Sequence, residues 1–84
     1  MQYVYILQSE KDGYLYVGCT SDLKKRLLLH NSGKITSTKD RLPPILIYYE
    51  AYKHQKDAHE REKYFKTGWG KRYIKKILFH YLHN

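Results

Sequence analysis

The sequence predicts a small α+β fold in which three strands form an antiparallel sheet and three helices flank it, in the order strand, strand, helix, strand, helix, helix. Three observations predict this class. β-branched and aromatic runs fill the first half of the chain, an Asp-Gly pair separates the first two runs, and apolar residues recur at helical spacing toward the C-terminus. The length of 84 residues is that of one domain, which we expect to span residues 1–84.

The first two strands are expected at Tyr3–Ser9 and Tyr14–Gly18, with Asp12–Gly13 as the turn of a hairpin. Side chains alternate between the two faces of a strand. If the faces of the two strands coincide, Tyr5 and Tyr16 are neighbours. Aromatic cross-strand pairs are also common for stability alone, so this pair has a purely structural alternative.

The first helix is expected to begin after Ser21 or Asp22, either of which can cap it, and to end near residues 31–33. Four of its residues recur at i, i+3, i+4 and i+7 and so share one stripe. They are Leu23, Arg26, Leu27 and His30. Because the leucines must face the sheet, Arg26 and His30 are expected on or beside the buried face.

The second half of the chain predicts a well-buried strand at Ile45–Tyr52 and a helix at about Gln55–Lys66. The glycines of Gly68–Trp69–Gly70 are expected to interrupt the helical run before a last helix at about Lys71–Leu82. Trp69, between two glycines, is expected to be a packing anchor.

The charge balance favours a polyanionic partner. Sixteen Lys and Arg residues stand against eight Asp and Glu, a net charge of +8, and most of the surplus lies after residue 52. Such a surplus attracts nucleic acid through counterion release, although a solvated basic face is the alternative. The single cysteine, Cys19, indicates a reducing compartment, and the absence of a long apolar run or signal peptide argues against a membrane. We therefore expect a cytoplasmic protein.

Glu62 is the most informative carboxylate in the sequence. It shares a helical face with Ala58 and Phe65, whereas Glu60 lies away from that face. A carboxylate among packing residues is costly unless a cation satisfies it. A metal ion is one candidate for that cation, and a structural ion pair with a nearby Lys or Arg is the other.

The segment 34–44 is polar, rich in hydroxyls and closed by two prolines, and it is expected to form a loop. Its candidate contacts to backbone phosphates are Lys34, Thr36, Ser37, Thr38, Lys39 and Arg41. An ordinary surface loop is the alternative. Four cations of the last helix either extend this footprint or form its solvated face: Lys71, Arg72, Lys75 and Lys76.

Together these residues resemble the GIY-YIG nuclease superfamily, in particular its short single-domain members, and also the N-terminal nuclease domain of an excision-repair endonuclease. The two tripeptides of the family align with Tyr3–Val4–Tyr5 and Tyr16–Val17–Gly18. The remaining matching segments are Gly18–Arg26, His30–Gly33, Pro44, Tyr49–Glu50, and Ala58 with Arg61–Glu62–Lys63 and Lys66. The match runs in order along nearly the whole chain.

The resemblance implies an endonuclease that hydrolyses phosphodiester bonds, with a role in DNA repair and with DNA favoured over RNA as substrate. The catalytic residues that it implies are Tyr5, Tyr16, Arg26, His30 and Glu62. With so few acidic residues, a single Mg²⁺ or Mn²⁺ on Glu62 fits better than a two-metal site. Arg26 would bind the phosphate, His30 would contact it or shuttle a proton, and either tyrosine would be the general base.

Two positions depart from the family pattern. Tyr3 replaces the first glycine, and Ile77 stands near the place where many active members carry an asparagine after the catalytic glutamate. The second departure and the net charge of +8 keep one alternative open, and the basic surface by itself keeps another. The chain could be a nucleic-acid-binding module that keeps the fold without cleavage, or an interaction protein with a merely basic surface.

Overall fold

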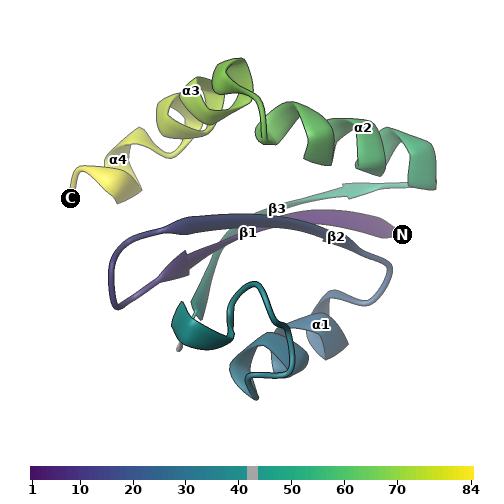
Figure 1. Ribbon diagram of the computed structural model, residues 1–84. Helices are drawn as coiled ribbons and strands as arrows, with labels where there is room; N and C mark the ends of the chain where they lie inside the picture. The colour runs from purple at the N-terminus through teal and green to yellow at the C-terminus, as the bar shows by residue number, and fades with distance from the viewer. Residues whose placement is uncertain (42–43) are drawn as a thin grey trace.

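The computed structural model describes residues 1–41 and 44–84 and places a three-stranded sheet between two helical layers (Figure 1). Helix α1 covers one face of the sheet, and α2, α3 and α4 cover the other. The elements are β1 (Gln2–Ser9), β2 (Leu15–Thr20), α1 (Leu23–Asn31), the short 3-10 helix η1 (Lys39–Arg41), β3 (Pro44–Tyr52), α2 (Gln55–Phe65), α3 (Gly68–Ile77) and α4 (Phe79–Leu82). The α+β class and the order of elements are confirmed, with the last predicted helix divided into α3 and α4.

The sheet has the strand order β2-β1-β3, and both pairings are antiparallel. Strand β1 is central, and Val4–Leu7 are at most 1% exposed because helices cover both of its faces. The prediction of a well-buried third strand was wrong. Strand β3 lies at an edge of the sheet, and its Tyr49 side chain is 52% exposed.

The two faces of β1 divide the interior. Val4 and Ile6 point toward α2 and α3 and form the apolar core with Val17, Ala58, Phe65 and Ile74. Tyr5 alternates with them and points to the α1 side. Full burial of one such apolar side chain contributes about 1.5–3 kcal/mol to the free energy of unfolding, so these contacts hold α2 and α3 on the sheet. The α1 side is left for polar residues.

Helix α1 is delimited as the sequence predicts. The Asp22 carboxylate accepts a hydrogen bond from the Lys25 amide at 3.0 Å, and Gly33 continues the chain at a φ of +77° after the helix ends. These two ends fix the rotation of the helix. His30 is therefore fully buried against the sheet, and Arg26 lies one turn before it, partly buried.

The junction between α2 and α3 differs from the prediction. Helix α3 begins at Gly68, because the Thr67 side chain accepts a hydrogen bond from the Gly70 amide at 3.1 Å and caps it. Gly70 is buried against the end of α2, where a Cβ atom would overlap the Tyr64 carbonyl. Trp69 consequently points outward and is 72% exposed, so its expected role as a packing anchor was wrong.

None of the helices within residues 1–41 and 44–84 combines the length and the apolarity that a bilayer crossing requires.

The close α2–α3 packing makes Gly70 irreplaceable while Gly68 is free to change. We expect Gly70→Ala to lower the free energy of unfolding by about 2 kcal/mol or more, because backbone atoms must move to admit the methyl group. Gly68→Ala is the control. No atom lies within 4 Å of the position that its methyl group would take, so the change should be within about 1 kcal/mol of neutral. Urea denaturation of both variants measures this, and equal stabilities would contradict the packing.

Candidate active site at the edge of the sheet

A chain of three buried side chains lies between β1 and α1. The Tyr5 hydroxyl is hydrogen-bonded to Nε2 of His30 at 2.9 Å, and Nδ1 of His30 is hydrogen-bonded to the Thr38 hydroxyl at 2.7 Å. All three side chains are at most 3% exposed. With both ring nitrogens engaged, the imidazole has one fixed orientation.

Gly18 makes room for this arrangement. It lies opposite Tyr5 in the β1–β2 ladder, and a Cβ atom at this position would overlap the Oη and Cζ atoms of Tyr5. Only glycine therefore lets the Tyr5 ring lie across β2. The last residue of the second tripeptide has a steric function that sequence reasoning had not assigned.

Tyr16 completes an aromatic cluster with Tyr5 and His30, and the predicted neighbourhood of the two tyrosines is confirmed. The Tyr16 ring centroid lies 6.3 Å from that of Tyr5 and 5.2 Å from that of His30. Unlike Tyr5, Tyr16 is partly exposed, and its side chain lines a surface cleft. Of the two phenols, only that of Tyr16 can meet a ligand from solvent.

The environment of Tyr5 and His30 keeps both side chains uncharged at neutral pH. Burial raises the pKa of Tyr5 well above its ordinary value, and the neighbouring Tyr16 and Glu62 raise it further against the opposing effect of Arg26. Burial also lowers the pKa of His30, and the positive charge of Arg26 lowers it further. The Tyr5–His30 pair is therefore a neutral hydrogen-bonded unit.

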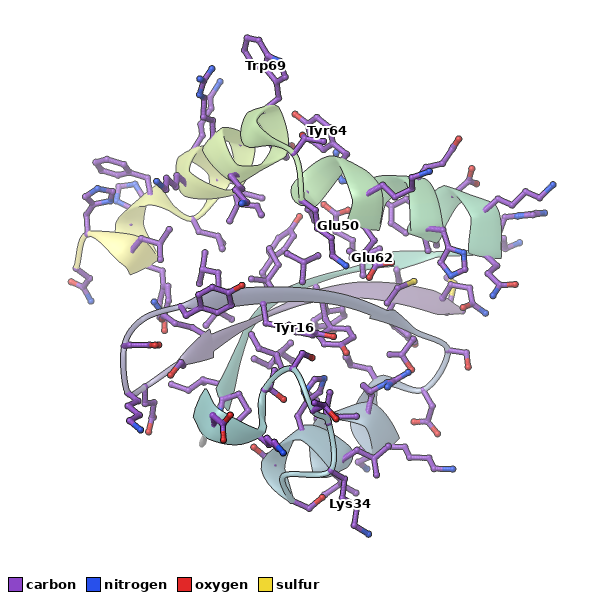
Figure 2. All side chains as sticks on the ribbon, in the orientation of Figure 1. Tyr16, Lys34, Glu50, Glu62, Tyr64 and Trp69 are labelled. Atoms are coloured by element: carbon purple, nitrogen blue, oxygen red, sulfur yellow. The ribbon has the colours of Figure 1, made fainter. Side chains whose placement is uncertain are left out.

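Arg26 and Glu62 reach the same region from opposite helical layers. Arg26 belongs to α1, whereas Glu62 lies between α2 and the sheet (Figure 2). Both charges nevertheless influence the pKa of the Tyr5 phenol, and burial, followed by the charge of Glu62, raises the pKa of Cys19 on β2. β2 is an edge strand, so no further strand lies beyond it in the described sheet. Arg26 and Glu62 therefore approach the Tyr5 phenol from different faces of the sheet.

Glu62 has a weak partner. Its Oε2 accepts a hydrogen bond from Nζ of Lys66 at 3.2 Å, one turn along the helix, and the Lys66 side chain is 56% exposed. Such an exposed i, i+4 pair contributes only about 0.3–0.5 kcal/mol. The structural ion pair that the sequence left open therefore exists, but it leaves Glu62 accessible at the rim of the site.

The donor set around Glu62 suits magnesium or manganese. No three His, Cys, Asp or Glu side chains gather as metal ligands in the described part of the chain. Mg²⁺ keeps several waters and is held by one or two carboxylates plus substrate phosphates. One partly exposed and weakly paired carboxylate meets that requirement.

The polar loop divides into exposed and buried members. The exposed ones are Lys34, Thr36, Ser37 and Lys39. Lys34 projects from the end of α1 away from the sheet (Figure 2), whereas Ser37 lines the cleft beside Tyr16. Thr38 is buried on His30 and has no surface to offer a phosphate, so we assign it to positioning the imidazole. The side chain of Arg41 and residues 42–43 lie outside what the structure describes.

A second carboxylate cluster on the α2 face was missed by sequence reasoning. Glu50 accepts hydrogen bonds from the hydroxyls of Tyr48 and Tyr52, both at 2.6 Å, and from Nε and Nη2 of Arg61 at 2.8 and 3.0 Å. Although burial opposes it, these hydrogen bonds lower the pKa of Glu50. The Arg61 guanidinium also lies 4.6 Å from the Phe65 ring centroid. The alternation Tyr-x-Glu-x-Tyr in β3 was the available signal.

Comparisons with known proteins find related sequences. Residues 1–75 match the GIY-YIG catalytic domain family. A UPF0213 protein of Bacillus pumilus is 46% identical over 66 residues, which cover 77% of this chain and 66% of the relative. UPF0213 proteins of Streptococcus agalactiae and Clostridium perfringens are 45% and 43% identical, over 76% and 79% of this chain and 73% and 71% of their own lengths. No solved structure matches the chain significantly.

The Glu50 cluster predicts a stability effect that is separate from any activity. We expect Glu50→Gln to lower the free energy of unfolding by about 2–4 kcal/mol, because Arg61 loses its counter-charge in a largely buried place. Glu60→Gln, on the exposed face of α2, is the matched control and should change stability by less than about 0.5 kcal/mol. Thermal unfolding of the two variants at one pH distinguishes them. Similar melting temperatures would show that the cluster is not stabilising.

His30 predicts a pH dependence of stability. Its pKa in the folded protein is below the ordinary 6.5, so the unfolded chain binds the proton first as pH falls. The stabilisation is therefore complete above pH 6.5 and is lost below it, with a slope of up to about 1.4 kcal/mol per pH unit. Urea titrations between pH 7.5 and 5.5 should lose most of this slope in His30→Gln. In the exposed control His80→Gln the slope should persist, and its disappearance there would contradict the assignment.

Proposed function

This chain belongs to the GIY-YIG family, and from that membership and the geometry of its site we propose that it is a metal-dependent endonuclease of nucleic acid, with DNA favoured over RNA. One observation carries the proposal. The two phenols of the β1–β2 hairpin lie side by side, and the guanidinium of α1 and the carboxylate of α2 both influence the pKa of Tyr5. Phosphodiester hydrolysis requires these groups: a base for the water, a cation for the phosphate and a metal ligand.

Tyr16 is the better candidate for the general base. Its phenol is partly exposed beside the cleft, whereas Tyr5 is 1% exposed and its raised pKa keeps it protonated. A water held next to Tyr16 would lose its proton to the phenolate as it attacks phosphorus. Tyr5 would act indirectly, since its ring packs at the flank of Tyr16 and its hydroxyl holds His30 in place.

Arg26 would bind the scissile phosphate. Its planar guanidinium can donate two parallel hydrogen bonds to phosphate oxygens, and α1 places it within electrostatic reach of both Tyr5 and His30. The same positive charge favours a deprotonated phenol beside it. His30, neutral and hydrogen-bonded at both nitrogens, is better suited to orienting Tyr5 than to carrying a proton to the substrate.

Glu62 would hold the metal ion. When bound there, Mg²⁺ or Mn²⁺ would supply Lewis-acid neutralisation of the charge that develops on the phosphate and leaving oxygens. Glu62 is suited to this because Lys66 is its exposed and weakly bound partner, which a cation could displace. Lys66 would then be free to contact a phosphate of the substrate.

A nucleic-acid-binding module without cleavage is the second candidate. It is favoured by Ile77, which stands on α3 near the place where many active members of the family carry an asparagine. The two candidates share the fold and the basic surface and differ only in turnover.

Cleavage assays decide between them. We expect the protein to cut branched, nicked or single-stranded DNA in Mg²⁺ or Mn²⁺, and Glu62→Gln and Tyr16→Phe to lower the rate at least about 100-fold by removing the metal ligand and the base. Glu60→Gln, two residues from Glu62 and exposed, should cut like the wild type. Activity that survives in Glu62→Gln would exclude the proposed mechanism. Salt-sensitive binding without cleavage by the wild type would favour the module.

A further inference from the structure

A cleft of about 480 Å³ runs along the open edge of β2, next to the candidate active site. Leu15 and Val17 on one face of β2 line it together with Tyr16 on the other face and Tyr14 just before the strand, so the cleft follows the rim of the strand and not one face. Its volume lies within the range of about 300–1,000 Å³ that small-molecule sites occupy. Tyr16 belongs both to this cleft and to the aromatic cluster.

The cleft has an apolar floor and a basic rim. Leu15 is the partly exposed apolar residue of its floor, and the nearly buried side chains of Val17, Phe65 and Ile74 lie directly beneath. Three lysines that are exposed to solvent stand around it: Lys66 at the end of α2, and Lys71 and Lys75 one turn apart on α3. The other cations of α3 do not line it, and Arg72 lies instead over the Trp69 ring at 4.9 Å. The basic residues of α3 therefore have two different surroundings.

The rim of β2 adds a third feature. Strand β2 pairs with β1 alone within the described sheet, so backbone N–H and C=O groups on its outer side have no neighbouring strand. An apolar floor, backbone donors and acceptors along a strand edge with no neighbouring strand, and flanking ammonium groups match the three parts of a nucleotide. These parts are an aromatic ring, a polar ring edge and a phosphate on either side.

We propose that this cleft holds one unpaired nucleotide of the substrate, with its base on the apolar floor and its flanking phosphates on Lys66, Lys71 and Lys75. The inference rests on the proposed function and gives it a substrate class, nucleic acid with an unstacked base beside the scissile phosphate. A paired base is stacked within its duplex and does not enter such a cleft, so bulges, flaps and single strands are selected over intact duplex.

Binding without cleavage tests this directly. The intact Glu62→Gln variant in EDTA is titrated with a hairpin DNA that carries one bulged 2-aminopurine, with the same hairpin carrying an abasic bulge, and with a fully paired hairpin. The RNA counterpart of the first probe reports the preference for the sugar. We expect a change in 2-aminopurine fluorescence on binding and an affinity for the bulged base on the order of tenfold above that for the abasic probe.

Two pairs of variants locate the effect. Lys71→Gln with Lys75→Gln should weaken binding about tenfold and reduce the slope of log affinity against log salt by about 1.4. Arg72→Gln with Lys76→Gln removes the same charge from the same helix outside the cleft and should change the slope much less. Ser37→Trp fills the cleft from the loop and should abolish the preference for a base, whereas the adjacent exposed Thr36→Trp should not.

The outcomes separate this inference from the nuclease proposal. Equal affinity for the bulged and abasic probes would overturn the nucleotide cleft even if Glu62-dependent cleavage is observed. So would an equal loss of binding in the Lys71/Lys75 and the Arg72/Lys76 double variants. A base-dependent fluorescence change that Ser37→Trp removes would establish the cleft even if the wild-type protein cuts nothing. Circular dichroism of each variant checks that the fold is retained.

Discussion

The Tyr5 ring lies in the space above Gly18 that any other residue would fill with a side chain, and its hydroxyl ends against His30. This contact ties the central strand to the edge strand and to α1 at once. It can exist only because β1 is covered on both faces, so that the phenol and the imidazole are shielded from water and from competing hydrogen bonds. The position of Tyr16, and the proximity of Arg26 to both neutral groups, follow from it.

Glu50 and Glu62 both face the sheet, but they differ in how strongly their carboxylates are paired. Glu50 receives four hydrogen bonds from three side chains, which leaves it fully committed to holding α2 against β3. Glu62, one residue after the arginine that binds Glu50, has an exposed lysine as its partner. Arg61 and Glu62 are consecutive on α2 but have different roles, because the helix turns Arg61 toward β3 and Glu62 toward β2. Arg61 stabilises the fold through Glu50, and Glu62 is the candidate metal ligand. Both carboxylates are partly buried, so the difference lies in their partners: a saturated carboxylate is inert, whereas a weakly paired one can bind a cation.

The order of the strands explains why groups from opposite layers can cooperate. Had β2 been central, a further strand would have closed the rim and separated α1 from α2. As an edge strand, β2 leaves open the cleft that Lys66, Lys71 and Lys75 border. An exposed strand edge can pair with a strand of another chain and so promote aggregation. Here the charged side chains of the three lysines flank the edge and discourage such pairing.

Local sequence determined much of this protein. The hairpin, the cap at Asp22, the helical stripe with His30 and the class of the fold follow from turn chemistry and periodicity, which act over a few residues. The tertiary structure decided which strand is central, and so reversed the expected burial of β3. It also turned Trp69 outward by packing Gly70 on α2, placed Thr38 inside on His30, and gave Glu50 its partners. These features depend on contacts between residues far apart in the chain, where burial and steric fit outweigh the preferences of neighbouring residues.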